Sequence, residues 1–62
     1  MYTRTVIHKI SERYQIIEHQ LIDNGKIVEV FFKVSDYDNN EYGGKYDELS
    51  EAISYIKDIT FS

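Results

Sequence analysis

Four residues, Asp23-Asn24-Gly25-Lys26, constrain the fold of this chain more than any others, because they separate two runs rich in Ile, Val and Phe. Asn-Gly is the preferred centre of a two-residue type I′ turn, in which both central residues need a positive φ. The turn therefore predicts an antiparallel hairpin that begins near Tyr14 and ends near Val34. In a regular register the opposing pairs are Ile22 and Ile27, Leu21 and Val28, His19 and Val30, and Ile17 and Phe32.

This register sorts the hairpin side chains into two sets, because side chains alternate between the faces of a sheet. The first set is nearly all apolar, so we expect it to face the core: Ile17, His19, Leu21, Val28, Val30, Phe32 and Val34. The second set is mixed: Ile16, Glu18, Gln20, Ile22, Ile27, Glu29, Phe31 and Lys33. Its four large apolar members would leave an exposed patch, and such patches often mark interfaces.

Residues 2–10 are rich in β-branched side chains and predict a further strand, joined to the hairpin through Ser11-Glu12-Arg13. We expect Val6, His8 and Ile10 to point inward, with Ile7 alone on the other side. A helix over residues 6–22 is the alternative, because Ile10, Tyr14, Ile17 and Leu21 also have helical spacing. The Asn-Gly turn between two β-rich runs favours the strands.

The last third of the chain predicts a loop and a helix. Residues 36–46 read as a polar, glycine-containing loop, and Asp47 is well placed to cap a helix. A helical stripe follows, formed by Leu49, Ala52, Ile53, Ile56 and Ile59, and we expect Phe61 to cover the end of the core. The predicted fold is one α+β domain over residues 1–62, a three-stranded antiparallel sheet (β-β-β-α) with the C-terminal helix packed on the Ile17–Phe32 face.

Length and composition narrow the function classes. A chain of 62 residues buries only about 60% of the surface of its unfolded form, so its core is marginal. It has no cysteine, which excludes disulfides and thiolate zinc sites and fits a reducing cytoplasm. Eleven acids against seven bases disfavour nonspecific binding to nucleic acids or membranes. No apolar run approaches the ~20 residues of a membrane span, and we expect a cytoplasmic protein.

Candidate catalytic and metal-binding groups are few. His8 and His19 are expected on the same face of neighbouring strands, and Glu18 and Glu29 on the other face, but neither pair belongs to a recognisable constellation. Asp36, Asp38 and Asn40 have the 1, 3, 5 spacing of a calcium loop, with Asp47 at position twelve. Glu41 occupies the position that needs Gly, however, and a strand precedes the loop. We expect no enzyme activity, no metal and no cofactor.

The unexplained apolar and tyrosine residues instead indicate a protein-binding surface. The candidate partner-binding residues are Ile16, Ile22, Ile27, Phe31, Tyr37 and Tyr42. We expect a small acidic regulator or inhibitor that occupies the surface of another protein. Its size and charge are typical of phage and mobile-element proteins that block host nucleic-acid enzymes or CRISPR-type defence complexes.

Three alternatives remain open. One is a sheet-based nucleic-acid module with Phe31 stacking on bases beside Arg4, Lys9 and Lys33. The second is a small metal-binding protein that uses the Asp36–Asp47 loop. The third, a homodimer that covers the second sheet face, is compatible with each function.

Overall fold

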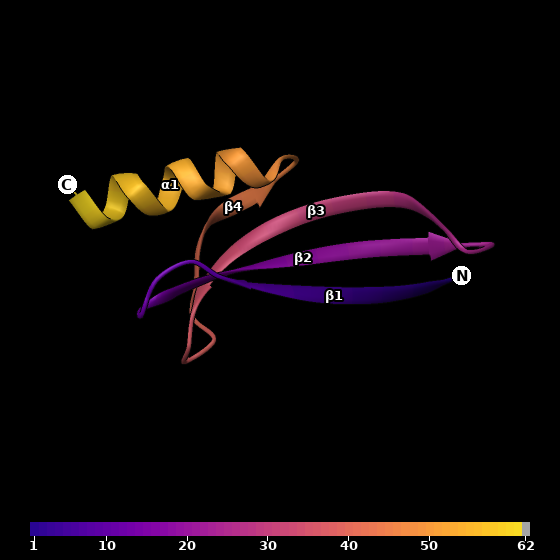
Figure 1. The fold of residues 1–62 in the computed structure, drawn as a ribbon, viewed down its shortest axis with the longest axis horizontal. Helices are drawn as coiled ribbons and strands as arrows, with labels where there is room; N and C mark the ends of the chain where they lie inside the picture. The colour runs from indigo at the N-terminus through magenta and orange to yellow at the C-terminus, as the bar shows by residue number, and fades with distance from the viewer. Residues whose placement is uncertain (62) are drawn as a thin grey trace.

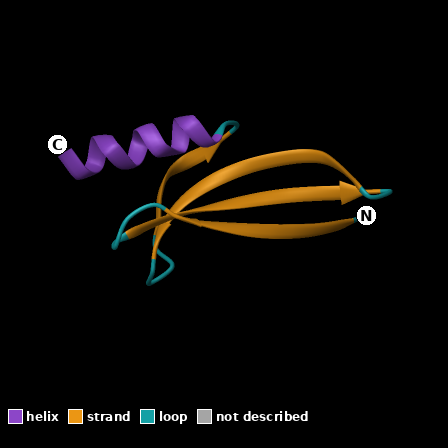
Figure 2. Ribbon diagram, in the orientation of Figure 1, coloured by secondary structure: helices purple, strands orange, loops and turns teal. Residues whose placement is uncertain are grey.

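The computed structural model describes residues 1–61, in which a four-stranded antiparallel sheet is followed by one helix (Figures 1 and 2). The elements are β1 (Tyr2–Lys9), β2 (Tyr14–Asp23), β3 (Lys26–Asp36), β4 (Glu41–Tyr46) and α1 (Leu49–Phe61). The strands lie in the sheet in their order along the chain. The α+β class and the C-terminal helix are confirmed, but the three-stranded sheet is wrong, because part of the predicted loop is a strand.

That additional strand, β4, exists because a short turn reverses the chain directly after β3. The backbone N–H of Asp36 donates to the carbonyl of Asn40, and Asn39 takes up a φ of 66°. Tyr42 then lies opposite Val34, and Tyr46 opposite Phe32. Gly43 and Gly44 weaken the β signal of this segment, so its propensity alone indicates a loop.

The central hairpin has the predicted turn but not the predicted register. Asn24 and Gly25 have φ values of 52° and 75°, as a type I′ turn requires. Ile22 pairs with Ile27, as predicted, but Leu21 pairs with Glu29, which leaves Val28 as the extra residue of a β-bulge. Because side chains alternate, this one-residue shift exchanges the two faces of β2 relative to β3. The other three predicted pairs are therefore wrong, and His19 lies opposite Phe31.

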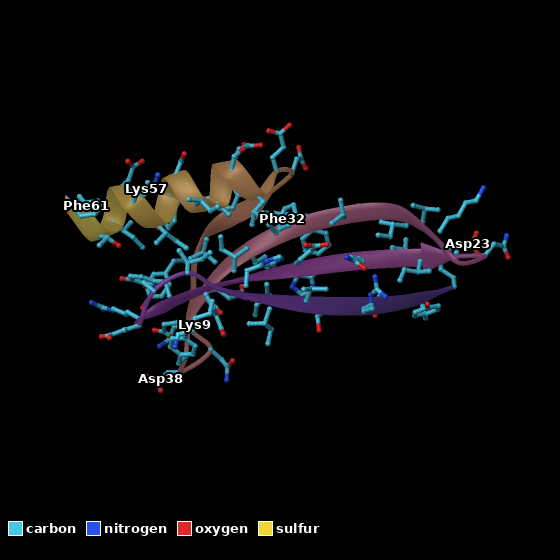
Figure 3. All side chains as sticks on the ribbon, in the orientation of Figure 1. Lys9, Asp23, Phe32, Asp38, Lys57 and Phe61 are labelled. Carbon is cyan, nitrogen blue, oxygen red and sulfur yellow. The ribbon has the colours of Figure 1, made fainter. Side chains whose placement is uncertain are left out.

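The core forms between one face of the sheet and α1. Its buried members are Tyr14, Ile16, Phe32, Val34, Ala52 and Ile56 (Figure 3 labels Phe32). The predicted helix stripe is confirmed, since Leu49, Ile53 and Ile59 pack against this cluster. Of the predicted core residues on β2 and β3, only Phe32 and Val34 are in it. Val28 and Val30 are exposed, while Ile17 and Leu21 point to the other face.

The two ends of α1 also differ from the prediction. The carbonyl of Glu48 accepts the Ala52 N–H at 3.4 Å, so Glu48 is the N-cap and Asp47 lies one residue outside the helix. Phe61 at the opposite end is 83% exposed and covers nothing (Figure 3).

The helix covers only part of one face. It contacts β2, β3 and β4 but not β1, and the outer part of the β1–β2–β3 sheet extends beyond it (Figure 1). The molecule is accordingly elongated, 42 × 21 × 15 Å. No helix within residues 1–61 combines the length and the apolar character that crossing a bilayer requires.

Candidate functional site

The side of the sheet that faces away from α1 is the candidate site, and we call it the open face. The strand registers define its members in rows across the sheet. They are Thr3, Thr5, Ile7 and Lys9 of β1; Gln15, Ile17, His19 and Leu21 of β2; Glu29, Phe31, Lys33 and Ser35 of β3; and Glu41 of β4.

The centre of the open face is apolar, and a hollow adjoins it toward the Glu29 end. Ile17, Leu21 and Phe31 are half-buried, and Ile7 is 63% exposed. The rings of His19 and Phe31 stack with centroids 4.7 Å apart and an interplanar angle of 10°. Between β1, β2 and β3 this side contains a hollow of about 230 Å³, lined by Thr3, Thr5, His19, Gln20, Leu21, Glu29 and Phe31. A side chain from a partner fits a hollow of this kind.

Charged groups surround this apolar centre. Lys45 Nζ lies 4.2 Å from the centroid of the Phe31 ring, and Lys33 Nζ lies 3.6 Å from Glu41 Oε2. Lys9 and Glu29 lie in the outermost rows, at opposite ends of the face. An apolar centre with a charged rim is the usual composition of a protein–protein interface.

The structure places the apolar residues predicted for the interface on both sides of the sheet. Ile16 is fully buried and Ile22 is 4% exposed, and both lie on the other side of the sheet. These two assignments are wrong because of the bulge at Val28. Ile27 is exposed beside the hairpin turn, away from the hollow. Only Phe31 of this predicted set lies on the open face.

The two predicted tyrosines make intramolecular contacts. The Tyr37 hydroxyl donates to the carbonyl of Ser11 at 3.1 Å, and the ring is about half exposed. The Tyr42 hydroxyl donates to Asp36 Oδ2 at 2.8 Å, and its ring meets that of Tyr14 edge to face. Tyr42 therefore supports the core beside α1, whereas Tyr37 remains accessible near the turn that follows β1.

The two histidines, predicted to share a face, lie on opposite sides of the sheet. His8 Nε2 lies 2.9 Å from Glu18 Oε1, and the Gln20 side-chain amide also donates to Glu18. The hydrogen bond from Gln20, followed by that from His8, outweighs burial and lowers the pKa of the Glu18 carboxyl. Arg4 donates in turn to the Gln20 carbonyl oxygen. These hydrogen bonds give partners to Arg4, His8, Glu18 and Gln20, which lie on the part of this side of the sheet that α1 does not cover.

The carboxylates Glu18 and Glu29, also predicted to be neighbours, are separated in the same way, with only Glu29 on the open face. The paired arrangement predicted for them is therefore wrong.

The acidic segment Asp36–Asn40 is a turn closed by its own hydrogen bonds. The Asp36 carboxylate accepts the N–H groups of Asp38 and Asn40, the Asn40 side-chain amide and the Tyr42 hydroxyl. Burial is the largest single influence on this group and opposes ionisation, but the hydrogen bonds together outweigh it and lower the pKa of Asp36.

The calcium-loop spacing is therefore not realised as a loop. β4 separates the turn from Asp47, and within residues 1–61 no three His, Asp or Glu side chains gather where they could hold a metal ion.

Ile17, Leu21 and Ile7 are the apolar open-face residues that the sequence pattern does not assign to an interface. Ile17 and Leu21 were assigned to the core by the regular register, and Ile7 was set aside as a lone apolar residue. The single bulged residue between Asn24-Gly25 and Phe31 places Ile17 and Leu21 on this side, and no sequence signal marks that bulge.

Comparisons of this chain with models of protein families, with curated proteins and with solved structures found no match.

Proposed function

We propose that this chain is a non-enzymatic protein-binding module, a small acidic regulator or inhibitor that occupies the surface of a partner protein with its open face. The observation that supports the proposal most strongly is the uncovered apolar centre formed by Ile7, Ile17, Leu21 and Phe31. The only helix of the described residues lies on the other side of the sheet and leaves this centre in water.

The energetics favour a partner at this position. Complete burial of an exposed large apolar side chain contributes about 1.5–3 kcal/mol, and the half-buried Ile17, Leu21 and Phe31 each gain the part of it that belongs to their exposed surface. The His19 stack and the Lys45 contact hold Phe31 in place before binding, which lowers the entropy cost of association. The hollow beside Phe31 gives a partner side chain a pocket to enter.

Affinity capture tests the proposal. The tagged chain is incubated with nuclease-treated lysate of its source or host, and bound proteins are identified by mass spectrometry. Phe31→Glu places a charge in the centre of the open face. Val30→Glu places the same charge one residue away, at a 37% exposed position on the opposite face. We expect a stoichiometric partner that is lost with Phe31→Glu and retained with Val30→Glu.

The same experiment can contradict the proposal. A partner retained by folded Phe31→Glu would show that the open face is not the binding surface. If no protein is captured, sedimentation of the wild type shows whether a second copy occupies this face instead.

A nucleic-acid-binding module is the second candidate, favoured by one observation. Lys9 and Lys33 lie on the open face with Phe31, and Lys45 reaches the Phe31 ring from β4. Aromatic side chains among basic groups stack on unpaired bases. Binding of a fluorescent single-stranded oligonucleotide that weakens steeply with salt and is lost with Phe31→Glu would favour this candidate. Binding that is absent at low salt would remove it.

A further inference from the structure

The free edge of β1 is a second feature that the fold leaves without a partner. Among residues 1–61, β1 pairs with β2 alone, in a register that runs without a shift from Tyr2 opposite Ile22 to Lys9 opposite Gln15. It contains no proline and no bulge, which are two of the devices that block pairing at a sheet edge, and its charged residues are the bases Arg4 and Lys9. The strand therefore presents a regular row of backbone groups to solvent.

The hydrogen-bond pattern identifies which residues supply that row. The Ile10 N–H donates to the carbonyl of Tyr14, so position 10 directs its backbone toward β2. Alternate residues of an antiparallel pair direct their backbone groups in opposite directions. The N–H and C=O groups of Thr3, Thr5, Ile7 and Lys9 therefore point to the free edge.

The other edge of the sheet is unsuited to strand pairing. β4 has only six residues, and its register with β3 shifts between Phe32 and Val34. Gly43 within it has a φ of 72°, which interrupts the regular ladder. Of the two edges, only that of β1 has a continuous template for an added strand.

The charge of β1 is opposite to that of the rest of the chain. Residues 1–11 contain Arg4 and Lys9 and no acid, while the remaining residues carry the other five bases and all eleven acids. Within residues 1–61, neither Arg4 nor Lys9 forms a salt bridge, and Arg4 donates to the neutral Gln20 side chain at 2.9 and 2.7 Å. After the hydrogen bonds from Gln20 and His8, the charge of Arg4 also helps to lower the pKa of the Glu18 carboxyl. A basic edge with free backbone groups favours an acidic strand.

We infer that the free edge of β1 accepts an extended acidic segment of the partner protein as a fifth strand of the sheet. The inference rests on the proposed function, and it names the chemistry of the segment that is bound. Backbone hydrogen bonds from Thr3, Thr5, Ile7 and Lys9 hold the segment, and its carboxylates lie near Arg4 on the side of the sheet that α1 occupies. Its alternate apolar residues lie on the opposite side, where they cover Ile7, 63% exposed, and extend the apolar centre of the open face.

A second copy of this chain fits the same edge poorly. β1 contains no acid, so antiparallel pairing of two β1 strands gives neither Arg4 nor Lys9 an acidic partner and doubles the positive charge along the seam. The edge therefore selects a segment of opposite charge over self-association.

The test uses the full chain labelled with ¹⁵N and a capped synthetic peptide of alternating Glu and Val. We expect the peptide to shift the backbone amide signals of Thr3, Thr5, Ile7 and Lys9 more than those of Leu21 and Phe31. The peptide with Lys in place of Glu, and the fully N-methylated Glu/Val peptide, should not bind. Absence of binding by the Glu/Val peptide, or equal binding of the Lys/Val peptide, would overturn the inference.

A pair of variants at position 5 tests the backbone row directly. Thr5→Pro removes an N–H at the free edge without removing a bond to β2, whereas Thr5→Ala keeps the N–H. Thr5→Pro loses a hydrogen bond and regular strand geometry at this position, so it should weaken peptide binding about tenfold or more, equivalent to at least 1.4 kcal/mol. Thr5→Ala should bind the peptide as the wild type does. If Thr5→Pro does not fold, the N-methylated peptide with the wild type decides the same question.

The two proposals fail in different ways. Loss of the captured partner with Phe31→Glu, together with no peptide binding at β1, would contradict the edge inference alone. Retention of the partner by Phe31→Glu and by Thr5→Ala, together with its loss with folded Thr5→Pro, would contradict the open face alone.

Discussion

The rings of His19 and Phe31 lie parallel across β2 and β3, with 4.7 Å between their centroids. Both side chains project from the open face, and Lys45 Nζ approaches the Phe31 ring at 4.2 Å. Aromatic pairs contribute about 0.5–1.5 kcal/mol beyond the area that they bury. An arrangement that could serve a partner therefore also stabilises the monomer.

His19→Ala removes this stack and should lower the free energy of unfolding by about 1 kcal/mol. Thr5→Ala, which lies beside His19 in the same row, is the control and should change it much less. Urea denaturation followed by circular dichroism measures both. Equal stability of His19→Ala and Thr5→Ala would show that the ring contact contributes nothing.

Gly43 and Gly44 are adjacent in β4 but differ in what an added methyl group would meet. At Gly43, where φ is 72°, a Cβ would lie 2.6 Å from Tyr46 Oη and 3.2 Å from the Tyr55 ring, whereas at Gly44 nothing lies within 4 Å. Gly43→Ala should destabilise the fold by more than about 1 kcal/mol through backbone strain and displacement of the Tyr46 hydroxyl and the Tyr55 ring. Gly44→Ala should be neutral or slightly stabilising. Thermal unfolding of both variants checks this, and similar Tm values would contradict it.

The helix contributes to stability through its buried stripe and not through its end. Ile56 is buried against the sheet, so Ile56→Ala should cost about 2–5 kcal/mol, much of the stability of so small a domain. Phe61→Ala removes a larger side chain that is 83% exposed and should change the free energy of unfolding by less than about 0.5 kcal/mol. A comparable loss in both variants, measured in urea, would mean that Phe61 packs against the core after all.

The hydrogen bond from Tyr42 to Asp36 predicts a specific pH dependence. Because the fold lowers the pKa of Asp36, the stabilisation is present above the pKa of the unfolded chain and is lost as the pH falls through the lower, folded value. Asp36→Asn should therefore have a flatter loss of stability on the acid side than the wild type. Tyr42→Phe, which removes one of the bonds to Asp36, should lie between the two.

On the alkaline side, the pH dependence of stability has the opposite sign. The bond donated to Asp36, and then burial, raise the pKa of Tyr42, so this contribution is present below the unfolded pKa and is lost as the pH rises through the folded value. Urea titrations across pH measure both limbs. An acid limb of Asp36→Asn identical to that of the wild type would contradict the role of this carboxylate.

Local chemistry made part of the fold predictable. Asn24 and Gly25 are residues that tolerate positive φ, and Ala52 and Ile56 follow the helical period, so the turn and the helix stripe could be read directly. The bulge at Val28 could not, because a bulged position accepts many residue types and leaves no mark in the sequence. That one residue decides which side chains of β2 face α1.

β4 was missed for a related reason. Its two glycines lower the strand propensity, and the alternating tyrosines that hold it on the core, Tyr42 and Tyr46, show their role only once the Asp36–Asn40 turn places them opposite β3. The charge contrast between β1 and the remaining chain is visible in the sequence, whereas the direction of its backbone groups is not.

The proposed interface depends most directly on which of Ile16 and Ile17 faces α1. The chain has no cysteine, so Ile16→Cys and Ile17→Cys each create a single thiol whose rate of modification reports its exposure in the folded protein. With the bulge at Val28, Ile17→Cys should react readily, while Ile16→Cys, at a position with 0% exposure, should react only as fast as the protein unfolds. Faster modification of Ile16→Cys than of Ile17→Cys in the folded protein is what a regular register without the bulge predicts. That result would contradict the account, because Ile16 and not Ile17 would then lie on the open face.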